Sequence, residues 1–183
     1  MSTALADSNL VGSFEAAFET DSVPTPVGDV IVVVKSGVLI ALDFEEYRDR
    51  MMKLLDKRFG SIELVSVENP AGVCDRVKQY FTGKLRALES MPMATGGTDF
   101  QRQVWQGLRG IAPGTVMTYG ELAQAMDNPK AVRAVGLANS LNPIAIALPC
   151  HRVVGAGGKL TGYAGGLERK QWLLSHEGVE IGQ

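Results

Sequence analysis

The chain has 183 residues, of which 45% are hydrophobic and 21% charged, a composition typical of a globular protein with a buried core. No apolar run approaches the ~20 residues that cross a membrane, and the first 21 residues lack the pattern of a signal peptide. We therefore expect a cytoplasmic protein without a membrane segment. The net charge is −2, but residues 98–183 carry 8 basic and 6 acidic side chains, which permits a local surface for an anionic partner.

The first elements along the chain are β-structure. Two runs rich in β-branched residues, DVIVVV and VLIALDF, flank Lys35-Ser36-Gly37 and predict a hairpin over residues 27–44. A helical pattern follows over residues 48–58, and Gly60 stands where a C-terminal cap is expected. Residues 62–67 alternate like another strand.

A second helix is predicted after Pro70, since Val73, Val77 and Tyr80 would share one helical face and Gly83 would end it. These elements predict a small α/β domain. We place an N-terminal extension at residues 1–22, this domain at 23–88, a linker at 89–97 and a C-terminal domain at 98–183. The linker, ESMPMATGG, has lost all periodicity.

The C-terminal domain is predicted to be mainly helical. Thr98 with Gln101, and Thr118 with Glu121, have the spacing of capping boxes that start helices. Asn128 and Pro129 would then cap and open a further helix, KAVRAVGLANS, which gives a helix-turn-helix. This last helix has little side-chain bulk, which is typical either of a backbone that approaches a partner closely or of tight packing on another helix. The fold class is therefore α/β, with a helix-turn-helix in the second domain.

The chain offers little for a metal or a cofactor. Cys74 and Cys150 are too few for a disulfide framework, and with His151 and His176 they lack the paired spacing of a zinc site. The glycines between Gly155 and Gly162 match neither the dinucleotide nor the P-loop template. We expect no metal and no cofactor.

Cys150 is the candidate nucleophile of the chain. A buried cysteine is usually a small core residue, but a nucleophilic thiol needs a base or a positive charge beside it, and His151 and Arg152 can supply both. The apolar run at residues 144–148 predicts a buried strand that ends at Pro149. Because adjacent side chains of a strand point to opposite faces, the chain must turn at Cys150, or the proton must pass through a water. Asn142 and Glu177 are both candidates to orient the histidine, and the sequence does not choose between them.

The residues around Cys150 are similar to those of a known protein family. The segment NPIAIALPCHRVVGAGGKLTGYAGGLERKQWLLSHEG closely resembles the active-site region of the O6-alkylguanine-DNA alkyltransferases, and the likeness extends through TDFQRQVW, TYGELA and KAVRAVGLAN. It covers nearly all of the chain after Val23. The implied activity is DNA repair by irreversible, stoichiometric transfer of an alkyl group from O6-alkylguanine to a cysteine of the protein.

The resemblance also implies roles for individual residues. Cys150 would accept the alkyl group, His151 would be its base through a water, Glu177 would orient His151, and Asn142 would shape the turn beneath them. Arg133 would enter the base stack when the damaged nucleotide is flipped out. Tyr119 would crowd the phosphate of that nucleotide, and small residues would let the helix enter the minor groove. The expected DNA-binding residues are Arg133, Tyr119, Ala131, Ala134 and Gly136, and the expected guanine pocket comprises Tyr119, Val153, Tyr163, Ala164 and Gly165.

Two other classes of protein remain open. A damage sensor or transcription factor could use the same helix-turn-helix, but the alkyltransferase-like sensors lack the acceptor cysteine that is present here. A cysteine hydrolase would need a distant base, for which His176 is the one other histidine, and an acyl-binding feature that we do not find. We expect a monomer that acts on double-stranded DNA.

Overall fold

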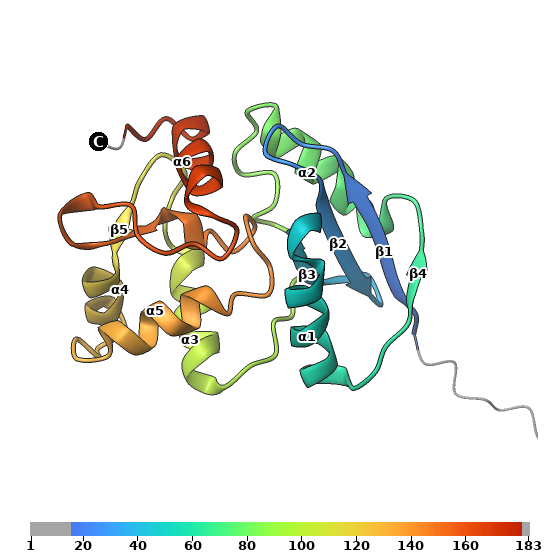
Figure 1. Cartoon of the computed structure of the whole chain (residues 1–183), viewed down its shortest axis with the longest axis horizontal. Helices are drawn as coiled ribbons and strands as arrows, with labels where there is room; N and C mark the ends of the chain where they lie inside the picture. Colours follow the sequence, from blue (N-terminus) through green and yellow to red (C-terminus); the bar gives the residue numbers. More distant parts are fainter. Residues whose placement is uncertain (1–15, 181–183) are drawn as a thin grey trace, which may run out of the picture.

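The computed structural model describes residues 16–180, which form two units lying side by side (Figure 1). The N-terminal unit is a four-stranded sheet with helices α1 (Arg48–Phe59) and α2 (Val73–Phe81). The C-terminal unit holds the helices α3 (Asp99–Arg109), α4 (Tyr119–Ala125), α5 (Val132–Ser140) and α6 (Leu167–His176). The predicted fold class, an α/β domain followed by a mainly helical one, is confirmed.

The sheet has the strand order β3-β2-β1-β4. Strands β1 (Phe18–Val23), β2 (Val30–Lys35) and β3 (Val38–Phe44) are antiparallel neighbours, and β4 (Leu64–Ser66) pairs parallel to β1. The predicted hairpin is present, and its turn at Ser36 and Gly37 has positive φ angles of 52° and 76° at both residues. Such a turn matches the right-handed twist of the strands that it joins.

Strand β2 is buried on both faces. Val30, Val32 and Val34 pack toward α2 and the C-terminal unit, whereas Ile31 and Val33 pack toward α1. The first group belongs to one continuous core that includes residues of both units, so the two units share a hydrophobic core. This shared core fixes the C-terminal unit against the sheet, because sliding one unit over the other would expose apolar surface.

One strand of the four-stranded sheet was not predicted. Residues 18–22, which the sequence assigned to an N-terminal extension, form most of β1, so that assignment is wrong for this part. The pattern is hidden because the middle of FETDSV is polar and half exposed, and only Phe18 and Val23 are buried. Residues 1–15 of the expected extension lie outside the described residues.

Both predicted capping boxes are present. The backbone NH of Gln101 donates to Thr98 Oγ1 at 3.2 Å, and Thr98 NH donates to Gln101 Oε1 at 2.9 Å. Thr118 and Glu121 make the same reciprocal pair at the start of α4. Helix α1 also ends as predicted, at Gly60 with a φ of 78°.

Helix α5 begins at Val132, and the predicted start at Pro129 is wrong. Asp127 takes a left-handed conformation (φ 55°) and Asn128 NH donates back to Ala123 O at 3.0 Å, which closes α4. A separate turn then joins Ala131 NH to Asn128 O, also at 3.0 Å. Asn128 is therefore used to end one helix and not to cap the next.

The run at residues 144–148 is a series of turns, and the predicted strand is absent. Ile146 has a φ of 66°, and Leu148 NH donates to Ile144 O at 2.9 Å, so the segment folds back on itself. Its beginning is attached to β3, because Leu42 NH donates to Pro143 O at 3.1 Å and Leu42 O accepts from Ala145 NH at 2.8 Å. The segment that leads to Cys150 thus adds to the edge of the N-terminal sheet.

The remaining elements are short. Strand β5 (Met117–Thr118) pairs parallel with β6 (Val153–Val154). The described part of the chain also contains the 3-10 helices η1 (Glu45–Tyr47), η2 (Pro70–Gly72), η3 (Cys150–Arg152) and η4 (Ala156–Gly158). Between residues 16 and 180, no helix has the length and apolar character needed to cross a membrane.

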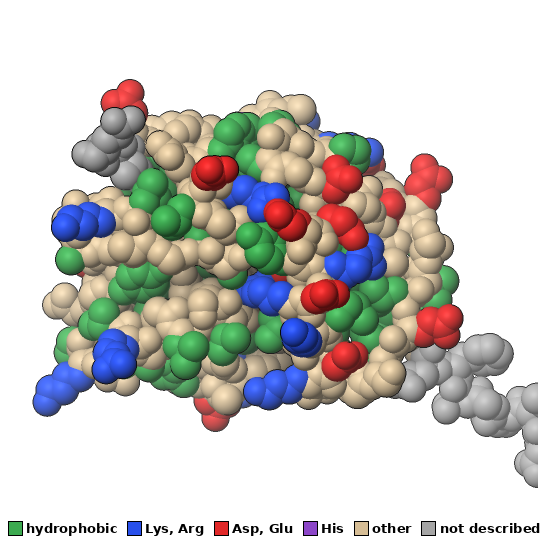
Figure 2. Space-filling view, viewed as in Figure 1, with side chains coloured by type: hydrophobic (Ala, Val, Ile, Leu, Met, Phe, Trp, Pro, Cys, Tyr) green, Lys and Arg blue, Asp and Glu red, His purple; other side chains and the backbone are tan. Residues whose placement is uncertain are grey.

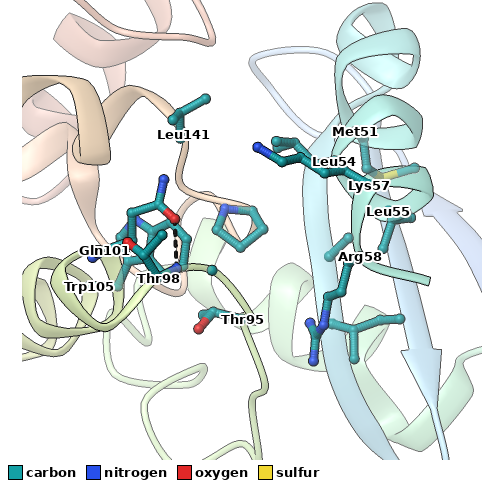
Figure 3. Close-up of a pocket in the computed structure, with 14 residues that line it drawn as sticks. Met51, Leu54, Leu55, Lys57, Arg58, Thr95, Thr98, Gln101, Trp105 and Leu141 are labelled. Carbon is teal, nitrogen blue, oxygen red and sulfur yellow. Dashed lines mark hydrogen bonds between the residues drawn. The ribbon is translucent and has the colours of Figure 1, made fainter. Parts of the chain in front are cut away.

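A cavity of about 240 Å³ lies between the two units (Figure 3). One wall comes from α1, with Met51, Leu54 and Arg58, and the opposite wall from Trp105 and its neighbours at the start of α3. Cys150, His151 and Glu177 are not among its lining residues. The chemistry predicted from the sequence therefore has to be sought elsewhere.

Candidate active site

Cys150 lies at the first position of η3, where the chain turns as the sequence required. The turn is closed by Arg152 NH, which donates to Pro149 O at 3.0 Å. Cys150 is 5% exposed and His151 fully buried. Burial raises the pKa of the Cys150 thiol above its usual range, opposed by the Asn142 amide and by the cations Arg50 and Lys170. The resting thiol is therefore protonated, and a base is needed to ionise it.

Asn142 shapes the segment that leads to the cysteine. Its amide Nδ2 donates to Leu148 O at 2.8 Å, and its Oδ1 accepts from Ile144 NH at 3.0 Å. Both bonds are buried and tie together the two ends of the folded run. Asn142 is thus bonded to the segment that leads to Cys150, and within the described residues no hydrogen bond joins it to His151.

Glu177 is the partner of His151. Its Oε1 accepts a hydrogen bond from His151 Nε2 at 2.9 Å, although the two residues come from different elements. Since an ionised carboxylate only accepts, the histidine carries its proton on Nε2. Within the described residues, Nδ1 is buried without a hydrogen-bond partner. This free nitrogen is the one able to take a proton.

A second residue holds the carboxylate in place. Arg152 forms a bidentate ion pair with Glu177, with Nε donating to Oε2 at 2.8 Å and Nη2 to Oε1 at 2.9 Å. Its remaining nitrogen, Nη1, donates to Ile111 O at 2.6 Å. Arg152 thus neutralises Glu177 and does not point its charge at the thiol, which differs from the role suggested by its position next to His151.

These contacts determine the protonation states of Glu177 and His151. Burial alone would raise the pKa of Glu177, but hydrogen bonds from His151, Arg152 and Tyr80 hold it well below its usual range. Burial is also the main influence on His151 and lowers its pKa, against the opposing effect of Glu177. Glu177 is therefore ionised and His151 neutral at neutral pH, which is the state that a general base needs.

A cavity of about 250 Å³ opens beside α4 and α5. Its walls include three residues that the sequence assigned to the guanine pocket, Tyr119, Tyr163 and Ala164, together with Gly136 and Asn139. Its lining does not include Val153 or Gly165, which the sequence also assigned to the pocket. Val153 is fully buried. A Cβ on Gly165 would lie 2.6 Å from Phe44, so this glycine lets the wall of the pocket approach β3.

The wall of the cavity is fixed by a buried lysine. Lys170 Nζ donates to Val153 O at 2.6 Å, to Thr161 O at 2.7 Å and to Gly162 O at 3.3 Å. Burial lowers its pKa to about 8. Lys170 therefore joins the strand that follows the cysteine to the loop that lines the cavity.

The exposed face of α5 carries Arg133, Ala134 and Leu137, and Ala131 precedes it at the N-cap. A Cβ on Gly136 would still be 3.9 Å from the Tyr119 ring, so packing alone does not require glycine at that position. On the face shown in Figure 2, acidic side chains gather over the N-terminal unit and are sparse over α4 and α5. The part of α5 that carries Arg133, Ala134 and Leu137 is thus exposed, whereas Ala131 packs in part against the core.

Two contributions to the site were missed. Tyr80, from α2 of the other unit, donates to Glu177 Oε1 at 2.7 Å, and Asn139 Nδ2 donates to Cys150 O at 3.4 Å. Tyr80 lies 97 residues from Glu177 in sequence, and no local pattern indicates the contact. No group of three or more potential ligands suited to a metal is found in residues 16–180.

Known proteins are similar to this chain in sequence and in architecture. Residues 20–95 match the family model for the ribonuclease-like domain of 6-O-methylguanine DNA methyltransferase, and residues 99–179 match that for its DNA-binding domain. A methylated-DNA–protein-cysteine methyltransferase of Salmonella typhimurium is 51% identical over 161 residues, which cover 86% of this chain and 94% of the relative. One from Methanosarcina mazei is 48% identical over 79% of this chain and 94% of the relative.

Solved structures agree with the sequence comparison. The Mycobacterium tuberculosis OGT in complex with DNA superimposes with a TM-score of 0.75 at 38% identity, covering 87% of this chain and 92% of that one. The O6-methylguanine-DNA methyltransferase of Pyrococcus kodakaraensis gives a TM-score of 0.71 at 30% identity, covering 88% and 99%. From its sequence, its fold and the buried Cys150 site, the chain belongs to the methylated-DNA–protein-cysteine methyltransferase family.

Proposed function

We propose that the protein repairs O6-alkylguanine in double-stranded DNA by moving the alkyl group onto Cys150 in a single, irreversible turnover. The observation that carries this proposal is the buried series Cys150, His151, Glu177, in which an ionised carboxylate holds a neutral imidazole with one nitrogen free. Family membership supplies the substrate class. Cys150 must stay reduced in order to act, and both cysteines are free, so we place the reaction in the cytoplasm.

The chemical step follows from this arrangement. His151 takes the thiol proton of Cys150 on Nδ1, by way of a water, and Glu177 stabilises the imidazolium that forms. The thiolate sulfur then attacks the alkyl carbon, a carbon–sulfur bond forms, and the bond between that carbon and O6 breaks. Its electron pair stays with the guanine, which gains a proton and is restored. The thioether has no route of removal at this site, so each molecule acts once.

DNA binding would use the exposed face of α5. The base has to leave the helix to reach a buried sulfur, which costs a few kcal/mol of lost stacking. Arg133 is exposed on α5 and would fill the gap, while Ala131, Ala134 and Gly136 would let the backbone approach the minor groove. The cavity lined by Tyr119, Tyr163 and Ala164 would receive the flipped guanine.

The test is mass spectrometry of the intact protein after incubation with an oligonucleotide that contains O6-methylguanine. We expect the protein to gain one methyl group, Cys150→Ser to gain none, and Cys74→Ser to behave like the wild type. Cys74 is the matched control because burial, with added effect from Asp21, raises its pKa to about 12. Binding without transfer would indicate a damage sensor, and neither binding nor transfer would favour a cysteine hydrolase.

A further inference from the structure

Tyr80 is tied to the end of α6 at two points. Its side chain is 1% exposed, and its hydroxyl donates to Glu177 Oε1 at 2.7 Å. Its backbone oxygen is 2.8 Å from Nε2 of His176, the residue before Glu177. The rings of Tyr80 and His176 also meet edge to face at 5.4 Å. The N-terminal unit therefore contacts the catalytic carboxylate directly, through a residue held in a fixed position.

The two carboxylate oxygens of Glu177 accept different numbers of hydrogen bonds. Oε1 accepts from Tyr80, His151 and Arg152, whereas Oε2 accepts from Arg152 alone. A carboxylate oxygen offers about two lone-pair directions, so three donors on Oε1 compete for its negative charge. The tyrosine bond is the shortest of the three.

We propose that Tyr80 is a positioning residue of the alkyl-transfer site, which acts through Glu177 to limit the charge available to His151 and so restrains the ionisation of Cys150. The proposal rests on the proposed function only in taking Cys150 as the nucleophile. It gives the N-terminal unit a part in the chemistry besides its part in the core. A protein that reacts once would gain from a thiol that stays protonated until a substrate is bound.

The direction of the effect follows from the competition at Oε1. The Tyr80 bond is strongest when His151 is neutral, because an imidazolium withdraws charge from the same oxygen. Tyr80 therefore favours neutral His151 over the imidazolium, and its removal should favour the imidazolium and the thiolate. The ion pair with Arg152 keeps the carboxylate in place when the hydroxyl is absent. The other titratable groups that face Cys150 and His151 are unchanged by the substitution: Asp43, Arg50, Tyr119, Tyr163 and Lys170.

The experiment titrates the Cys150 thiolate by its ultraviolet absorption in Cys74→Ser protein without DNA. In Tyr80→Phe we expect the titration to move to lower pH and the thiolate fraction at pH 7 to rise by roughly three- to tenfold, which corresponds to the net contribution of one ordinary hydrogen bond. Site-specific replacement of Tyr80 by 3-fluorotyrosine, whose hydroxyl is the stronger donor, should move the titration to higher pH. This second variant keeps the shape of the side chain and decides the question if Tyr80→Phe fails to fold.

Phe81→Leu is the matched control, because Phe81 belongs to the same helix and packs on Tyr80, Trp172 and His176, but its side chain has no group that could donate a hydrogen bond to Glu177. Its titration should coincide with that of the parent protein. The proposal is overturned if Tyr80→Phe leaves the titration unchanged, if it moves it to higher pH, or if Phe81→Leu moves it equally. Absence of methyl transfer from DNA in the parent protein would refute the proposed function but not the shift in the thiolate titration.

Discussion

Replacing Glu177 by glutamine should damage both the stability and the chemistry of the protein. The carboxylate is buried and accepts four hydrogen bonds, from Tyr80, from His151 and twice from Arg152. A glutamine oxygen can replace Oε1, but its NH2 group then faces Arg152 Nε, donor against donor. Arg152 is 4% exposed and would lose its counter-ion. Breaking a buried pair in this way costs about 3–5 kcal/mol.

A loss of this size is measurable. At roughly 2–4 °C per kcal/mol for a protein of this length, the Tm of Glu177→Gln should fall by about 10 °C. Glu180→Gln is the control, since Glu180 is exposed three residues further along and should melt like the wild type. The folded fraction of the variant should transfer methyl groups slowly at neutral pH and recover in part only above ~8.5, the pKa of a free cysteine, because burial raises the pKa of Cys150 beyond that value.

The dependence of folding stability on pH in the acid range gives a further check. The pKa of Glu177 is lowered in the folded protein, so its contribution to stability is present above the pKa of an unfolded glutamate, ~4.3, and is lost as pH falls below it. The difference in stability between wild type and Glu177→Gln should therefore shrink below about pH 4. A variant that melts with the wild type and shares its pH–rate profile would refute the reasoning, and Asn142 would be the next residue to test.

Two other variants test the DNA face and the pocket. Arg133→Ala should slow repair in duplex DNA about tenfold or more, while reaction with free O6-alkylguanine base stays nearly unchanged, because only the duplex requires the vacated stack to be filled; equal losses in single-turnover rates would assign Arg133 another role. Gly165→Ala should lower stability by about 1–3 kcal/mol in urea unfolding, since its Cβ would lie 2.6 Å from Phe44. An unchanged unfolding midpoint would show that β3 can move away from the loop.

The sequence predicted the features whose causes are local. Thr98 with Gln101 starts α3, Gly60 ends α1 in a positive-φ conformation, and the Ser36–Gly37 turn closes the hairpin. Each of these signals acts between residues at most a few positions apart, so a single sequence contains it. The resemblance to the alkyltransferases supplied what local patterns could not, the pairing of Cys150 with distant residues.

The features that were not predicted depend on distant parts of the chain. The turns of residues 144–148 are stabilised by Asn142 and by the edge of β3. An apolar run considered alone predicts a strand instead. Strand β1 is polar in its middle and is fixed by its neighbours on both sides. The direction of Arg152 toward Glu177 depends on how η3 packs against the end of α6, and that of Tyr80 toward the same carboxylate depends on how the two units pack together.

The attachment of the segment before Cys150 to β3 bears on the order in which the protein folds. Leu42 bonds to Pro143 and Ala145, about a hundred residues later in the chain. The sheet that provides this edge is synthesised first, and domains generally fold as units while the chain emerges from the ribosome. We therefore expect the segment that carries Cys150 to dock on a sheet edge that is synthesised before it, so that the surroundings of the cysteine form late in folding.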